Sequence, residues 1–148
     1  MAAGIGEAAS IAGIISLAGQ AVQAVTTITA FCNAYKNVHQ DIVRASRDLE
    51  ILRRVLLHVE TTATFALLPS RCPQGLLSHL RDCISACRKD LHEWNDWSRK
   101  VNLDCAGRLE KIWKKLKIAA DKSHFSKLSS GVSTHIEGIT LCCQLLNW

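Results

Sequence analysis

Three side chains suited to soft metal ions recur at intervals of four residues in the middle of the chain. His79, Cys83 and Cys87 share one face of any helix that contains them, because residues four apart are neighbours on a helix surface. Imidazole and thiolate are ligands that zinc prefers in proteins. The spacing suggests no fourth ligand, however, and free cysteine commonly serves as a small buried hydrophobic residue. We therefore interpret these residues as structural and expect no metal site.

A second pattern, Gly4-x-Gly6-x-x-Ala9, matches the loose glycine motif of dinucleotide-binding proteins. That chemistry requires a strand before the first glycine, so that the turn delivers phosphate to the N-terminus of a helix. Only three residues precede Gly4, which leaves no room for the strand. We expect no nucleotide and no other cofactor.

Catalytic patterns are missing from the sequence. Cysteine catalysis needs a histidine base beside an exposed thiol, and none of the six histidines lies in a nucleophile motif. The sequence also has no phosphate-binding loop, no paired-carboxylate signature and no serine elbow. We therefore predict that the protein is not an enzyme, which leaves binding, assembly or membrane contact as its functional classes.

Composition is that of one ordinary globular domain. The 148 residues are 48% hydrophobic and 21% charged, which makes disorder improbable. No Lys or Arg precedes Lys36, although a secretory signal would need a basic start. Together with the odd count of seven cysteines, this predicts reduced thiols and a cytoplasmic protein. Ala2 stands where N-myristoylation requires glycine.

The N-terminal segment carries no charged residue from Ala8 to Tyr35. Its apolar and small residues form two series at helical spacing, which predicts a helix that is apolar on both faces and is either buried or in lipid. At about 1.5 Å per residue, this segment is long enough to cross a hydrocarbon core of about 30 Å. The candidate membrane-insertion residues are Ile5, Ile11, Ile14, Ile15, Leu17, Val22, Val25, Ile28 and Phe31.

Positive charge is concentrated in residues 99–127, which contain nine basic and three acidic residues and so carry a net charge of +6. Such a patch attracts anionic lipid, at about 1 kcal/mol per basic residue near the surface, or binds nucleic acid, or is a solvated helix face. Because it accompanies an uncharged helix, we favour lipid and consider nucleic acid unlikely. Trp97, Trp113 and Trp148 are core residues or membrane-interface anchors. The candidate anionic-lipid residues are Arg99, Lys100, Arg108, Lys111, Lys114, Lys115, Lys117, Lys122 and Lys127.

The remaining sequence has the periodicity of amphipathic helices. One apolar stripe, at alternating intervals of four and three, comprises Val38, Ile42, Ala45, Leu49, Leu52, Leu56 and Val59. A second comprises Leu80, Ile84, Cys87, Leu91 and Trp94, and a third comprises Phe125, Leu128, Val132, His135, Ile139, Cys142 and Leu146. A short basic helix over 109–116 carries Leu109, Ile112, Trp113 and Leu116 between them.

Polar or proline-containing segments separate these helices. We place the breaks near 33–39, at the loop 68–75 that holds both prolines, and at 102–107. Four or five helices joined by short loops form a bundle. The sequence thus predicts an all-α fold, a four- to five-helix antiparallel bundle with an apolar N-terminal helix, in which residues 1–148 form a single domain.

The first residues carry a family resemblance. The string from Glu7 to Gln20, EAASIAGIISLAGQ, resembles the start of the HeLo-like N-terminal domains of fungal STAND (NLR-like) proteins, a group also labelled by the azaphilone-pigment-cluster protein L N-terminal domain. Residues 49–56 look like the family's second helix, 108–114 like its basic Trp-containing segment, and 141–146 like its closing helix. The resemblance covers nearly the whole chain, although only the first string is fairly specific.

This resemblance implies a function. Several HeLo and HeLo-like domains are cell-death effectors of fungal incompatibility that oligomerise and expose their N-terminal helix to the plasma membrane, and they resemble the four-helix executioner domain of necroptosis. The resemblance also implies that this domain is the N-terminal module of a larger protein, followed by a nucleotide-binding oligomerisation domain. It implies a cytoplasmic protein that moves to the plasma membrane on activation.

Two functional hypotheses follow. The first is a membrane-targeting effector of regulated cell death, in which self-association releases the N-terminal helix and the basic patch docks on anionic lipid. The second is a signalling module that binds a protein partner or self-associates without membrane activity. The second is motivated by the apolar register that runs from Ile14 to Val59, which is long enough for an intermolecular helical seam.

Overall fold

Long α-helices make up the part of the chain that the computed structural model describes, namely residues 2–34, 40–66, 74–104 and 123–148. The helices are α1 (Ala2–Ala34), α2 (Gln40–Ala66), α3 (Gln74–Asp104) and α5 (Ser123–Leu146). These ranges contain no strand, and the predicted all-α bundle with an apolar N-terminal helix is confirmed.

The helix ends agree with two of the predicted breaks. Helix α1 ends at Ala34 and α2 begins at Gln40, and α2 ends at Ala66 before α3 begins at Gln74. Helix α3 runs three residues into the break predicted at 102–107. The short basic helix predicted at 109–116 lies outside the described residues.

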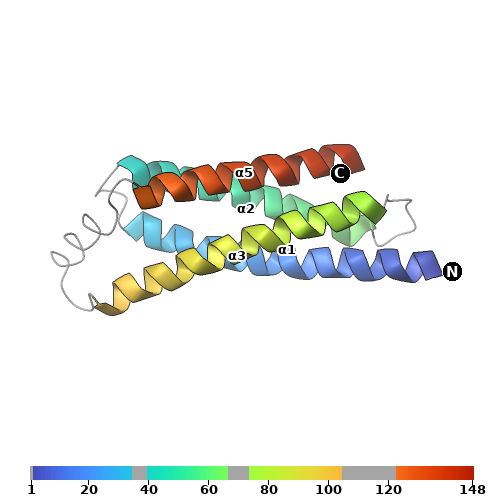
Figure 1. The fold of residues 1–148 in the computed structure, drawn as a ribbon, viewed down its shortest axis with the longest axis horizontal. Helices are drawn as coiled ribbons and strands as arrows, with labels where there is room; N and C mark the ends of the chain where they lie inside the picture. The colour runs from blue at the N-terminus through green and yellow to red at the C-terminus, as the bar shows by residue number, and fades with distance from the viewer. Residues whose placement is uncertain (1, 35–39, 67–73, 105–122) are drawn as a thin grey trace.

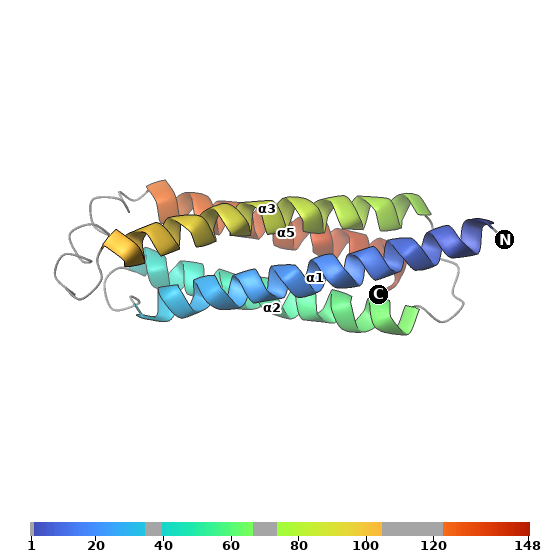
Figure 2. The same ribbon diagram turned by 90° about the horizontal axis from the view of Figure 1, so that it is seen from below.

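The four helices lie at the corners of a square. Helix α1 packs against α2 and α3, and α5 packs against the same two helices, so that α1 and α5 are diagonally opposite. In Figures 1 and 2, α1 and α3 run in one direction along the long axis while α2 and α5 run in the other. The pairs α1·α2 and α3·α5 are therefore antiparallel, whereas α1·α3 and α2·α5 are parallel neighbours.

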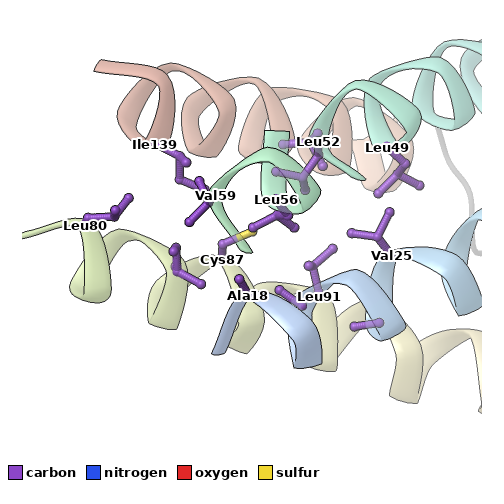
Figure 3. Close-up of a cluster of buried hydrophobic side chains, with 14 of the residues drawn as sticks. Ala18, Val25, Leu49, Leu52, Leu56, Val59, Leu80, Cys87, Leu91 and Ile139 are labelled. Carbon is purple, nitrogen blue, oxygen red and sulfur yellow. The ribbon is translucent and has the colours of Figure 1, made fainter. Parts of the chain in front are cut away.

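The described members of the apolar stripes predicted for α2, α3 and α5 point into the space between the helices. Val38 and the side chain of Phe125 lie outside the described residues. From Ile42 to Val59 every member of the α2 stripe is buried, and Ala63 extends it by one turn. Figure 3 shows side chains from all four helices meeting in this core, among them Ala18, Leu56, Leu91 and Ile139. Burial of apolar surface at about 25 cal/mol per Å² is the main force that holds the bundle together.

The end of α5 has a defined cap. Asn147 adopts a left-handed conformation with φ of 56°, which asparagine tolerates better than most residues. The amide of Trp148 then donates to the carbonyl of Cys143 at 2.8 Å and satisfies an acceptor at the helix terminus. Trp148 itself is half-buried and packs against the core, which is the first of the two roles expected for it.

Candidate functional site

Helix α1 buries one broad face. The two apolar series predicted to lie on both faces both point inward, since the series that begin at Ile11 and Ile14 are only about 60° apart around a helix. The side chains of Ile15, Leu17 and Val22 are half-buried and pack against the core. The expectation that this helix is apolar on both faces is therefore wrong. The buried residues are Ile11, Ile14, Ala18, Ala21, Ala24, Val25, Ile28, Phe31 and Cys32.

From Ile11 to Ala34, the exposed face of α1 consists of uncharged polar residues and alanines, and several of its polar groups bond to their own helix. The Thr26 hydroxyl donates to the carbonyl of Val22 at 2.9 Å, and the Thr27 hydroxyl donates to that of Gln23 at 3.1 Å. Such bonds leave fewer polar atoms that need water. The outer face consists of Ala12, Ser16, Gln20, Gln23, Thr26, Thr27, Ala30, Asn33 and Ala34.

From Ile11 to Ala34, the described side chains of α1 that make polar contacts with neighbouring helices are neutral. Asn33 Oδ1 accepts from the Ser46 hydroxyl of α2 at 2.9 Å, and Gln20 Oε1 accepts from the Arg88 guanidinium of α3. Between Ala8 and Ala34 the sequence offers no charge for an ion pair. Packing and a few neutral acceptors therefore hold this part of α1 in the bundle.

Aromatic rings fasten the C-terminal part of α1 to α3. The Phe31 ring meets Trp97 edge-on, with ring centroids 5.8 Å apart, and Trp97 meets Trp94 in the same way at 5.7 Å. Such pairs add about 0.5–1.5 kcal/mol beyond their burial. Of the two roles expected for Trp97, the structure displays packing against the core. Trp113 lies outside the described residues.

By length and composition alone, α1 is the one described helix that could cross a membrane. The candidate span is Ile11–Ala34, and 39% of its most apolar stretch is buried inside the bundle. The core helix of a soluble protein satisfies the same test, so the observation is compatible with both roles. Eight of the nine candidate insertion residues lie in this span, whereas the side-chain surroundings of Ile5, near the start of α1, lie outside the described residues.

Three of the nine candidate lipid-binding residues are described. Arg99 and Lys100 are exposed in the last turns of α3, and Lys127 is exposed near the start of α5. Figure 1 shows that these two helix ends lie at the same end of the bundle as the C-terminal end of α1. The other six, Arg108, Lys111, Lys114, Lys115, Lys117 and Lys122, lie outside the described residues.

The structure adds a basic groove that sequence reasoning missed. Arg88, His92 and Arg99 lie on one face of α3 and line a hollow of about 240 Å³ against Gln20, Gln23, Ala24 and Thr27 of α1, with Asn95 at its base. Among the described residues, no acidic side chain lines this hollow, and none accepts a hydrogen bond from the buried Nε of Arg88. The spacing of these residues on α3 places them on one face, but the pairing with α1 was not readable from the sequence.

The cysteine thiols of the core are poorly suited to nucleophilic chemistry. Burial raises the pKa of Cys32 to about 12, and burial together with the Asp90 carboxylate raises that of Cys87 to about 12. Both thiols are therefore protonated at neutral pH, although thiolate is the reactive form. Figure 3 places Cys87 within the apolar core, so the predicted face of His79, Cys83 and Cys87 does not converge on one point.

One His–carboxylate pair lies between α3 and α5. His135 Nε2 and Asp90 Oδ2 are 2.6 Å apart, and the His135 side chain is only 15% exposed. The hollow beside them, about 180 Å³, is lined by no Ser, Thr or Cys that the pair could activate. We interpret the pair as a tie between the two helices, placed at the polar edge of the α5 stripe.

The chain matches no protein-family model, no curated protein and no solved structure. The resemblance to HeLo-like domains therefore stays a prediction that depends on the residues quoted for it.

Proposed function

We propose that this chain is a non-enzymatic effector domain that targets membranes through α1. In the resting bundle the apolar face of α1 is covered by α2 and α3. On activation and self-association, α1 leaves that position and enters an anionic membrane. The basic end of the bundle, which holds Arg99, Lys100 and Lys127, stays at the lipid headgroups. The consequence, following the resemblance to HeLo-like domains of fungal NLR-like proteins, is regulated cell death at the plasma membrane.

The observation that carries this proposal is the outer face of α1. A helix that only completes a soluble bundle gains solubility from charged side chains on its exposed face, as α2 does with Arg44, Arg47 and Arg54. Between Ile11 and Ala34, the exposed positions of α1 hold alanine, serine, threonine, glutamine and asparagine instead. Each charge at the centre of a bilayer costs about 2.5–3.5 kcal/mol, so a stretch without any is compatible with insertion.

The basic end supports the orientation of α1 in the membrane. Arg99, Lys100 and Lys127 surround the end of the bundle where α1 stops, so headgroup binding there holds the C-terminal end of α1 at the surface. The groove with Arg88 and Arg99 adds donors that suit a phosphate or carboxylate oxygen. Arginine recognises such planar or tetrahedral anions through its forked donors.

Dye leakage from liposomes that contain anionic lipid tests the proposal, with Thr26→Lys compared against Thr64→Lys. Thr26 and Thr64 are both exposed, and the Thr64 hydroxyl also bonds to the carbonyl four residues earlier, at 2.8 Å in α2. Each change adds the same positive charge to an outer face, so surface attraction to the liposome is equal. We expect Thr26→Lys to bind but not leak, because its charge must enter the bilayer, and Thr64→Lys to leak like the wild type.

Equal leakage from both variants would show that α1 does not enter the membrane. Absence of leakage and of binding for the wild type, on anionic liposomes at low salt, would overturn the proposal as a whole, because screening is weakest there. Liposomes without anionic lipid serve as the control for the basic end.

A second candidate is a self-association module without membrane activity. The register from Ile14 to Val59 that motivated it is used inside the bundle, but α5 exposes Leu141 and Leu145 one turn apart, at 55% and 56%. Light scattering of the wild type and of Leu141→Lys tests this candidate. A dimer that becomes a monomer in the variant, together with no leakage from the wild type, favours it over the membrane effector.

A further inference from the structure

Helices α3 and α5 bring three metal-binding side chains to one point. His79 and Cys83 come from α3, and Cys142 comes from α5, 59 residues further along the chain from Cys83. Their ligand atoms all lie within 4.8 Å of one another, and His79 Nε2 is 3.9 Å from Cys83 Sγ. The set differs from the one that helical spacing suggested, because Cys142 takes the place of Cys87.

The local structure explains this convergence. His79 and Cys83 are one turn apart, so both face α5, while Cys87 lies in the core. Gly138 precedes Cys142 by one turn, and a Cβ there would stand 3.7 Å from Cys83 Sγ. Helix α5 therefore places a glycine, Gly138, opposite the Cys83 thiol and the Cys142 thiol next to it.

The arrangement has a closed side and an open side. Cys142 is 1% exposed, Cys83 is half-buried, and His79 is exposed. An ion can thus enter from solvent past the imidazole and reach the thiols at the helix interface. Water remains available on the His79 side to fill a further coordination position.

The distances suit a small thiophilic cation. In a tetrahedral zinc site, Zn–S and Zn–N bonds of about 2.3 and 2.0 Å place neighbouring donor atoms about 3.5–3.8 Å apart. His79 Nε2 and Cys83 Sγ, 3.9 Å apart, lie just above that range, and no pair of the three ligand atoms is more than 4.8 Å apart, so side-chain rotations that close each gap by about 1 Å or less bring them to zinc-binding distance. Two thiolates also neutralise the charge of a divalent ion, which lowers the cost of placing it between two helices.

We propose that His79, Cys83 and Cys142 bind one Zn²⁺ ion, with water as the fourth ligand, and that the ion clips α5 to α3. Each thiol releases its proton to solvent as its sulfur binds the metal, and the imidazole binds through Nε2, so two protons leave for each ion bound. The clip is independent of the proposed membrane function, because α1 contributes no ligand to it.

Both thiols are available to a metal ion. The described residues contain no disulfide, and Cys83 and Cys142 are both free.

The test is a titration of the reduced, metal-free full chain with Zn²⁺ alone, and separately with Co²⁺, whose thiolate bonds absorb in the near ultraviolet. We expect one ion per chain and a rise in the melting temperature with Zn²⁺, because a ligand that binds only the folded state stabilises it. Cys83→Ala and Cys142→Ala should abolish the Co²⁺–thiolate absorption. His79→Ala should weaken Zn²⁺ binding by at least about tenfold, the smallest effect expected even for groups that merely orient a metal ligand.

Cys87→Ala is the matched control, since it removes a thiol one turn from Cys83 on the same helix. It should retain full binding, as should a variant in which Cys72 and Cys105 are both replaced by alanine. His79 is exposed, so His79→Ala tests the site even when the loss of a buried cysteine prevents folding. Failure of the wild type to take up Zn²⁺, or binding as tight as that of the wild type in Cys142→Ala or His79→Ala, overturns the proposal.

Discussion

Helices α1 and α2 bury similar inner faces but differ completely on their outer faces. Both contribute large aliphatic side chains to the core, such as Ile14 and Ile28 from α1 and Leu49 and Leu52 from α2. Outside the core, α2 carries both signs of charge, including Glu50 with Arg53 and Arg54, whereas α1 carries none from Ala8 onward. The bundle constrains only the inner face, so the outer face is where the two helices can differ in function.

The first way to test this comparison is to truncate one inner residue in each helix. Ile14→Ala in α1 and Leu52→Ala in α2 each remove a side chain with no exposed surface, which costs about 2–5 kcal/mol of unfolding free energy. Urea unfolding measures both. Similar losses confirm that the inner faces are equivalent, whereas a loss below about 1 kcal/mol for Ile14→Ala alone, well under the range for buried residues, contradicts the equivalence.

A second test uses pH, because Cys32 is the one ionisable side chain between Ala8 and Ala34. Burial raises its pKa from near 9 to about 12, so the folded state holds a proton that the unfolded state has lost. Stability contributed by this group is complete below pH 9 and falls as pH rises through the interval to 12, by about 1 kcal/mol between pH 9 and 10.

We therefore expect the unfolding free energy of Cys32→Ala to decline less steeply than that of the wild type above pH 9. The measurement is urea unfolding at pH 8, 9 and 10 with reduced protein. If the unfolding free energies of the two proteins fell in parallel with pH, the bundle would not bury this thiol.

A third test concerns the two ends of the bundle. Arg99→Gln removes a positive charge where α1 stops, and it should weaken binding to anionic liposomes by about 1 kcal/mol, or roughly fivefold. Arg81→Gln is the control on the same helix, about 27 Å away by helical rise and beyond the screening length of about 8–10 Å in physiological salt. Equal weakening by both variants in a sedimentation assay would exclude a localised lipid-binding end.

The smallest effect is expected on the outer face of α2. Glu50→Gln removes ion pairs to Arg53 at 3.2 Å and to Arg54 at 3.7 Å, both partly exposed. Such pairs on a helix surface contribute about 0.3–0.5 kcal/mol. Thermal unfolding in low and in high salt measures the loss, which should vanish at high salt. A larger loss would mean that the charges of α2 support the fold rather than its solubility.

Sequence alone was sufficient wherever apolar and charged residues alternate. In α2, α3 and α5 the charged positions mark the outer face, so the stripes through Leu52, Ile84 and Ile139 were identified correctly. In α1 nothing marks the outer face, and two adjacent series were therefore assigned to opposite faces. When a helix has no charged residues, its sequence alone does not show which face is buried, and the positions of the neighbouring helices are needed to decide.

Sites built from residues of two helices could not be predicted from the sequence, for a related reason. The basic groove needs α3 beside α1, and the cysteine pair needs Cys142 of α5 beside Cys83 of α3. Periodicity locates a residue on its own helix but does not determine which helix faces it. Helical spacing therefore grouped His79 with Cys83 and Cys87 of the same helix, which we interpreted as structural, and gave no sign that Cys142 of α5 lies beside them.

The square arrangement also has a consequence for how the chain folds. Because α2 and α3 are diagonally opposite, the bundle consists of two helical hairpins, α1·α2 and α3·α5, packed side by side as parallel pairs. The α1·α2 hairpin has contacts as local as Asn33 with Ser46, 13 residues apart, whereas His135 and Asp90 of α3·α5 are 45 residues apart and Gln20 and Arg88 of α1·α3 are 68 apart. We therefore expect the contacts of α1·α2 to form first. Hydrogen exchange in such a protein follows cooperative units, so we expect the α3·α5 hairpin to exchange as a unit of its own when α1 leaves the bundle.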